Sequence, residues 1–110
     1  MTLEELQNAV FNDLKTELKN DADYNENVLA SKVAQAVREV MAARRYPSYY
    51  LEEAIAADME RFYSNVYKIA LYDYNQIGID FQTGHNENGI NRSFSDRSKL
   101  FYGVIPIAVV

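Results

Sequence analysis

Residues 55–69 read Ile55-Ala-Ala-Asp-Met-Glu-Arg-Phe-Tyr-Ser-Asn-Val-Tyr-Lys-Ile69. Apolar side chains recur in this stretch at spacings of four, three, four and three residues, at Ile55, Met59, Phe62, Val66 and Ile69. That period predicts one apolar face of a helix. We expect the helix to begin with Ser48 as its cap and to run to Gln76, with Gly78 in the left-handed conformation beyond its end. Such a helix is roughly 40 Å long, so part of it should pack on another surface.

A first helix is predicted at the start of the chain. Thr2 and Glu5 have the spacing of a capping box, in which each side chain bonds the backbone of the other residue. The apolar positions that follow recur every three or four residues, at Leu3, Leu6, Val10, Leu14 and Leu18. We expect this helix to end near residues 19–21, where polar residues cluster.

A second helix is predicted from the next apolar stripe. Asp23 or Asn27 can cap it, and the helical period continues through Arg44. It should end before Tyr46, because Pro47 disfavours helical backbone at the residue before it.

The pattern changes after residue 79. Residues 81–95 contain Gly84, Gly89 and four Asn or Gln side chains, and we expect a loop or arm there. One short helical turn is expected from Asp96 to Phe101, and an apolar tail runs from Gly103 to Val110. An apolar tail needs a surface that covers it. The sequence therefore predicts an all-α fold. Residues 1–79 would form a small bundle of three main helices with a long third helix, and residues 80–110 would form an extended C-terminal arm.

The composition excludes several classes of protein. The chain has 110 residues, a formal net charge of −5, no cysteine and one histidine. Disulfides, thiol catalysis and cysteine-based metal sites are excluded, and a histidine-built metal site is improbable. The acidic balance argues against tight binding of nucleic acid. We expect no signal peptide and no membrane span, and hence a cytosolic protein or part of an assembly made there.

The candidate catalytic groups form no constellation. The adjacent pairs Glu4-Glu5 and Glu52-Glu53 diverge by about 100° on a helix, whereas shared acid–base chemistry needs convergence. His85 lies in a polar, glycine-flanked loop without a local nucleophile or orienting acid. We therefore expect no enzyme activity, no cofactor and no metal.

Three tyrosines follow one another along the predicted third helix. Tyr63, Tyr67 and Tyr74 project at roughly 80°, 120° and 100° from Ile55 and widen the apolar face into an aromatic flank. Tyrosine is common both at the edge of a core and at subunit interfaces. Both interpretations stay open for these residues.

Asp73 projects in line with the apolar stripe of the same helix. A carboxylate there is costly unless it is paired or lies beyond the core. Either this end of the helix leaves the core, or Asp73 meets an arginine. Arg92 and Arg97 in the arm are the candidates, from the same subunit or a neighbouring one.

Two long segments carry a resemblance to a known family. The first is Asp58-Met-Glu-Arg-Phe-Tyr-Ser-Asn-Val-Tyr-Lys-Ile-Ala-Leu-Tyr-Asp-Tyr-Asn-Gln-Ile-Gly78, and the second is Gln82-Thr-Gly-His-Asn-Glu-Asn-Gly-Ile-Asn-Arg-Ser-Phe94. Leu100-Phe101 and the short apolar tail follow them. Together they resemble head–tail connector (head-completion adaptor) proteins of tailed phages and prophages of Gram-positive bacteria.

The resemblance implies a structural protein of the virion, made in the bacterial host cytoplasm. Such subunits form a ring at the head–tail junction, twelve-fold in the virion, between the portal protein and a tail-side connector or stopper protein. DNA passes through the lumen without sequence-specific binding, and no membrane is involved. The arm would reach neighbours or the portal. The residues expected at subunit or portal interfaces are Tyr63, Tyr67, Asp73, Tyr74, Arg92, Phe94, Arg97, Leu100, Phe101, Ile105 and Ile107.

Two other functions are open from the sequence alone. The chain could be a small helical regulator or interaction domain that dimerises through its long helix, since the apolar spacing permits about two heptads of pairing. It could also be a small enzyme that uses Asp73, His85 and a tyrosine as acid and base, although no spacing supports this beyond chance.

Overall fold

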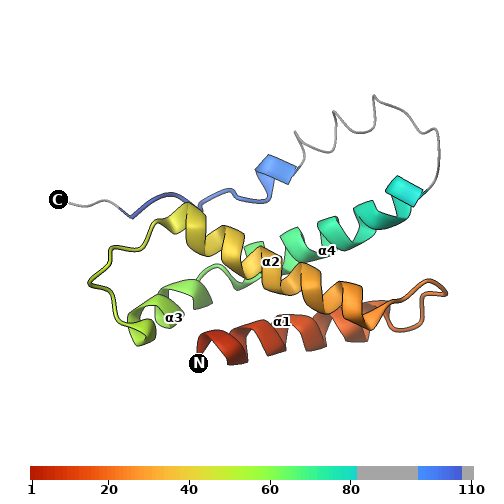
Figure 1. Cartoon of the computed structure of the whole chain (residues 1–110), viewed down its shortest axis with the longest axis horizontal. Coiled ribbons are helices and arrows are strands. Elements are labelled where there is room, and N and C mark those ends of the chain that lie inside the picture. The colour runs from red at the N-terminus through yellow and green to blue at the C-terminus, as the bar shows by residue number, and fades with distance from the viewer. Residues whose placement is uncertain (82–96, 108–110) are drawn as a thin grey trace.

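The computed structural model describes the backbone of residues 1–81 and 97–107, and side chains for residues 1–76 and 97–107 (Figure 1). The helices are α1 (Leu3–Leu18), α2 (Glu26–Arg44), α3 (Glu52–Glu60) and α4 (Tyr63–Phe81). Residues 97–99 add one helical turn, and the described part of the chain contains no strand. The predicted all-α class is therefore confirmed.

The capping box of α1 is formed as predicted. The amide of Glu5 donates to Thr2 Oγ1 at 3.1 Å, and the amide of Thr2 donates to Glu5 Oε1 at 2.9 Å. The helix buries one residue per turn, namely Leu6, Val10, Leu14 and Leu18.

The cap of α2 is Asn25, so the prediction of Asp23 or Asn27 was wrong. Asn25 has extended backbone, and its Oδ1 accepts a hydrogen bond from the amide of Val28 at 3.1 Å. At the other end Arg45 adopts the left-handed conformation, with φ 52°. Its amide bonds back to carbonyls of the last turn, and the helix ends at Arg44, three residues before Pro47.

The predicted long third helix is two helices, α3 and α4, separated at residues 61–62. The amides of Arg61 and Phe62 donate to the carbonyls three residues earlier, at 3.1 and 2.9 Å, which tightens the chain into a turn. The apolar period continues through this turn, because Met59 before it, Phe62 within it and Val66 after it are all buried. The spacing therefore could not reveal the break.

Both predicted ends of that helix were also wrong. The cap of α3 is Leu51, which makes no side-chain capping bond, and Ser48 lies in a turn before it. Helix α4 continues to Phe81, so Gly78 lies within the helix rather than beyond it. At 19 residues α4 is about 28 Å long, well short of the roughly 40 Å expected for the unbroken helix.

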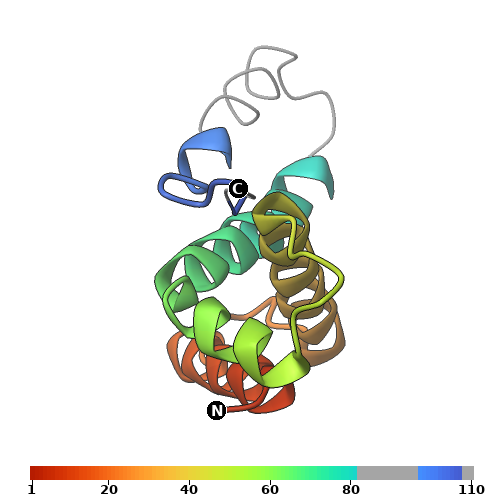
Figure 2. The same ribbon diagram turned by 90° about the vertical axis from the view of Figure 1, so that its left-hand side faces the viewer.

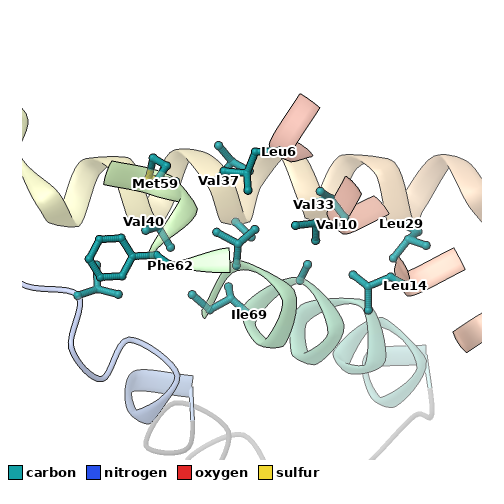
Figure 3. Packing of buried hydrophobic residues seen from close by; sticks show 14 of the residues in the cluster. Leu6, Val10, Leu14, Leu29, Val33, Val37, Val40, Met59, Phe62 and Ile69 are labelled. Carbon is teal, nitrogen blue, oxygen red and sulfur yellow. The ribbon is translucent and has the colours of Figure 1, made fainter. Parts of the chain in front are cut away.

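The core lies between α1, α2 and α4. Helices α2 and α4 pack on each other and cross in the view of Figure 1, α1 lies below them, and α3 packs against α1 (Figures 1 and 2). Figure 3 shows Val40 of α2 close to Met59 of α3 and to Phe62 in the turn that follows α3. The apolar stripe predicted for the third helix is therefore buried in the core of the same chain.

The C-terminal segment, residues 97–107, returns to the helical body. It lies above α2 and α4 in both Figures 1 and 2, on the side opposite the start of α1. Val104 is 8% exposed, and Leu100 and Phe101 pack against the core. This packing forms two separate clusters of charged side chains.

Candidate functional site

The first group is the Arg44 cluster, formed by Arg44, Tyr46 and Asp58. Arg44 Nε and Nη2 donate to the two carboxylate oxygens of Asp58 at 2.8 and 2.9 Å. The Tyr46 hydroxyl donates to Asp58 Oδ2 at 2.6 Å. The side chains of Arg44 and Asp58 are only 11% and 13% exposed. This is a nearly buried, bidentate ion pair between α2 and α3, the strong geometry for such a pair.

Helix α2 places Arg44 in this position. It follows Val40 by four residues and therefore continues the buried stripe of the helix. Burial raises the pKa of Asp58, but the hydrogen bonds from Arg44 and Tyr46 outweigh it and hold that pKa below its usual value. Burial, with the neighbouring carboxylate, raises the pKa of Tyr46. The carboxylate is therefore ionised and the phenol neutral at pH 7.

Arg44 also holds the C-terminal segment. Its Nη1 donates to the carbonyl of Ile105 at 2.9 Å, and its own carbonyl accepts from the amide of Ile107 at 2.8 Å. Its guanidinium lies 5.0 Å from the centre of the Phe62 ring. One residue thus connects α2, α3, the turn between α3 and α4, and the C-terminal segment.

The second group is the Arg97 cluster, formed by Arg97, Asp73 and Glu39. Arg97 Nε and Nη2 donate to the two oxygens of Asp73, both at 2.8 Å. Nη2 also bonds the carboxylate of Glu39 on α2. The Asp73 side chain is 14% exposed, and the bond to it raises the pKa of Arg97. Of the partners predicted for Asp73, the structure shows Arg97 of the same chain; Arg92 lies outside the described residues.

A turn in the C-terminal segment rests on α4. The Asn65 amide donates to the carbonyls of Leu100 and Tyr102 at 2.8 and 3.1 Å. Gly103 has φ +84°, a conformation that costs glycine least, and the amide of Val104 then donates to Phe101 O at 2.8 Å. This turn points Val104 into the core and leaves Tyr102 at the surface, 89% exposed.

The predicted aromatic flank lies against α1 and the start of α2. The hydroxyls of Tyr63 and Tyr67 bond the carboxylates of Asp13 and Glu17. Burial, with Asp13, raises the pKa of Tyr63 to about 12, and the bond to Glu17, with burial, raises the pKa of Tyr67 to about 12.

Tyr74, the third member of the flank, accepts a hydrogen bond from the amide of Asn25 at 2.9 Å through its hydroxyl. All three hydroxyls are therefore engaged within the chain, as the core-edge interpretation requires. A role for the flank between subunits stays a prediction.

The other predicted interface residues divide into three groups. Leu100, Phe101 and Ile107 are half-buried in the docked segment, and Ile105 is 64% exposed. Phe94, like Arg92 and His85, lies outside the described residues. The structure thus brings Asp73, Arg97 and Phe101 together, with the Arg97 guanidinium 5.6 Å from the Phe101 ring centre.

Sequence reasoning missed a groove between the start of α1 and α3. The groove has a volume of about 630 Å³, and Met1 and Leu51, both more than half exposed, lie beside four glutamates. The glutamates are Glu5, Glu52, Glu53 and Glu60. Each adjacent pair lies on its own helix, but α1 and α3 together bring Glu5 of the first pair and both members of the second pair to a common groove. Leu51 directly before Glu52-Glu53 was the available signal.

Residues 1–76 and 97–107 contain no group of three or more side chains that could hold a metal ion. None of the described helices is both long and apolar enough to cross a membrane. Both charged clusters are closed ion pairs that fasten one element to another. No family model, curated protein or solved structure matches the chain.

Proposed function

We propose that this protein is a structural subunit of the head–tail connector of a tailed phage or prophage. In this role it would assemble as a ring between the portal protein and a tail-side partner, and DNA would pass through without being read. The proposal starts from the resemblance of residues 58–78 and 82–94 to such adaptor proteins.

One observation carries the proposal, namely the way the C-terminal segment is docked. Arg44 of α2 holds the backbone of this segment and Asp73 of α4 holds its Arg97 side chain, while Tyr102 and Ile105 are 89% and 64% exposed. Exposed apolar side chains on a docked segment favour a protein that acts by contact. The mechanism that follows is packing and docking, without a chemical step.

The surface through which a homodimeric regulator was expected to pair is buried in the core. Pairing of the predicted third helix with a copy of itself needs Met59, Phe62 and Val66 on the outside. These three residues are at most 6% exposed. A dimer would have to use another face.

The test is binding to the portal protein encoded in the same genome. We expect the full chain, co-expressed with that portal, to co-purify with it and to add a ring of density at its base in electron micrographs. An unrelated acidic helical protein of similar size controls for non-specific binding. A chain that leaves the portal bare, and is missing from purified virions, would overturn the proposal.

A further inference from the structure

Two exposed faces of this protein have opposite charge and lie on opposite sides of the molecule. The acidic face is the groove of Met1, Leu51, Glu5, Glu52, Glu53 and Glu60. The basic face is formed by Tyr102 and Ile105 with Arg45, Lys68 and Lys99. Figures 1 and 2 show the start of α1 and α3 on one side of the α2–α4 pair and residues 97–107 on the other.

The basic face is defined by contacts around the C-terminal segment. Arg45 follows the residue that bonds Ile105 and Ile107, and its side chain is exposed. The amide of Tyr102 donates to the carbonyl of Lys99 at 3.1 Å, and the Lys99 side chain is exposed. Lys68 lies one turn after Asn65, which bonds this segment, and therefore on the same side of α4. Residues 97–107 include no acidic residue.

We propose that the occupant of the acidic groove is a second copy of this chain, which inserts Tyr102 and Ile105 of its basic face. Tyrosine is a frequent anchor of interfaces, and among the large apolar side chains that the structure describes Tyr102 is the most exposed. Glu52 and Glu53 would then flank an apolar contact and meet Arg45 and Lys68 of the copy. Within the chain, Glu5 accepts from the amide of Thr2, and Glu60 lies 3.7 Å from the N-terminal ammonium of Met1. Complementary charge around an apolar centre sets the partner and the orientation.

Charge also selects the symmetry of the contact. A two-fold dimer through either face would place glutamates against glutamates, or cations against cations, and such juxtaposition costs several kcal/mol. A contact between two different faces is heterologous, so every copy keeps one free face of each kind. Repetition gives a closed ring or an open filament. The inference deepens the proposed function by naming the ring contact, and it rests on that function only for closure at the portal.

Two variants, each substituted on only one of the two faces, test the contact. The acidic-face variant carries Leu51→Ala and Glu53→Lys, and the basic-face variant carries Lys68→Glu and Tyr102→Ala. All four side chains are exposed, so both variants should fold, which circular dichroism checks. Asp21→Lys, on the α1–α2 connection and away from both faces, is the matched control.

Sedimentation velocity across a wide concentration range provides the readout. We expect the unsubstituted chain and the control to grow beyond dimers, less so at high salt. Each variant alone should show a dissociation constant raised about tenfold or more. An equimolar mixture of the two should form a one-to-one complex and stop there, since one intact face of each kind remains. Growth of either variant to the size of the unsubstituted chain, or no complex in the mixture, overturns the inference.

The outcomes separate this inference from the proposed function. A chain that stays monomeric, alone and as mixed variants, yet binds the portal, overturns the head-to-tail contact and leaves the connector. A mixture that forms the one-to-one complex from a chain that never binds the portal supports the contact and overturns the connector.

Discussion

Replacing Asp58 with asparagine tests whether the Arg44 cluster holds the helices and the C-terminal segment together. The substitution keeps the size of the side chain and removes its charge. The guanidinium of Arg44 and the hydroxyl of Tyr46 are left in place, but they face a neutral amide in a nearly buried site.

The structure sets the size of the expected effect. The two partners of the ion pair are 11% and 13% exposed, so water compensates little for the lost charge. Breaking a buried pair by removing one partner costs about 3–5 kcal/mol, and an asparagine keeps part of the hydrogen bonding, so we expect about 2–4 kcal/mol. Domains of this size have about 5–15 kcal/mol of stability in total. The midpoint of thermal unfolding should therefore fall by on the order of 10–20 °C.

Two measurements check this expectation. Urea unfolding followed by circular dichroism gives the free energy of unfolding. Hydrogen exchange at the amide of Ile107, which donates to Arg44 O at 2.8 Å, reports the docking of the segment. Lys15→Gln is the control, because the Lys15–Glu26 pair has a comparable distance of 2.7 Å but is 46% and 52% exposed. Its loss should cost less than about 1 kcal/mol.

Two results would refute the reasoning. A loss in Asp58→Asn as small as that of the control would show that the cluster contributes no more than a surface pair. A large loss of stability with unchanged exchange at Ile107, relative to amides of the helices, would show that the cluster joins α2 to α3 but does not hold the segment.

Three further predictions concern the packing around the clusters. Tyr74→Phe removes the hydroxyl that accepts from the amide of Asn25, the cap of α2, and should lower the free energy of unfolding in urea by about 1 kcal/mol. The folded-state pKa of Asp58 is depressed, so its contribution is present above the ordinary carboxyl pKa of about 4 and is lost as pH falls through the lower folded value. Urea titrations below about pH 4 should show that loss in the unsubstituted chain and less of it in Asp58→Asn. Val104→Ala should cost about 1–2 kcal/mol because Val104 is buried, whereas Ile105→Ala should stay within about 0.5 kcal/mol, and equal losses would contradict the orientation of the turn.

Features that depend on neighbours in sequence were predictable. The capping box of Thr2 and Glu5 joins residues three apart, and the stripe of α1 repeats every three or four residues. Both were predicted, because the groups that interact lie within one or two turns. The all-α class follows from the same local signals.

The break between α3 and α4 was not predictable from the period. A turn at Arg61 and Phe62 that bonds three residues back leaves Met59 and Val66 on the buried side. The choice of Asn25 over Asp23 depends in part on Tyr74, which is 49 residues away and accepts from its amide. Such contacts between residues far apart in the sequence decide the helix boundaries that local helix propensity leaves open.

Of the two charged clusters, one was predictable in part from the sequence and the other was not. Asp73 on an apolar face required a partner, and Arg97 was one of two candidates. The same reasoning applies to Arg44, which follows Val40 by four residues and so lies on the stripe of α2. A cation at such a position implies a buried carboxylate elsewhere. The sequence offered many acidic residues and no means of choosing Asp58 among them.

The two hydrogen bonds that join Arg44 to the C-terminal segment have a mechanical consequence. A pull on residue 107 is first resisted by two hydrogen bonds that both end on Arg44, one on its side chain and one on its backbone. Arg44 passes the load to α2 along the chain and to α3 through Asp58. Tension on the segment is thus shared between two helices rather than concentrated in the turn at Gly103. The end of α2 therefore acts as an anchor point, and the segment can bear force without first unravelling.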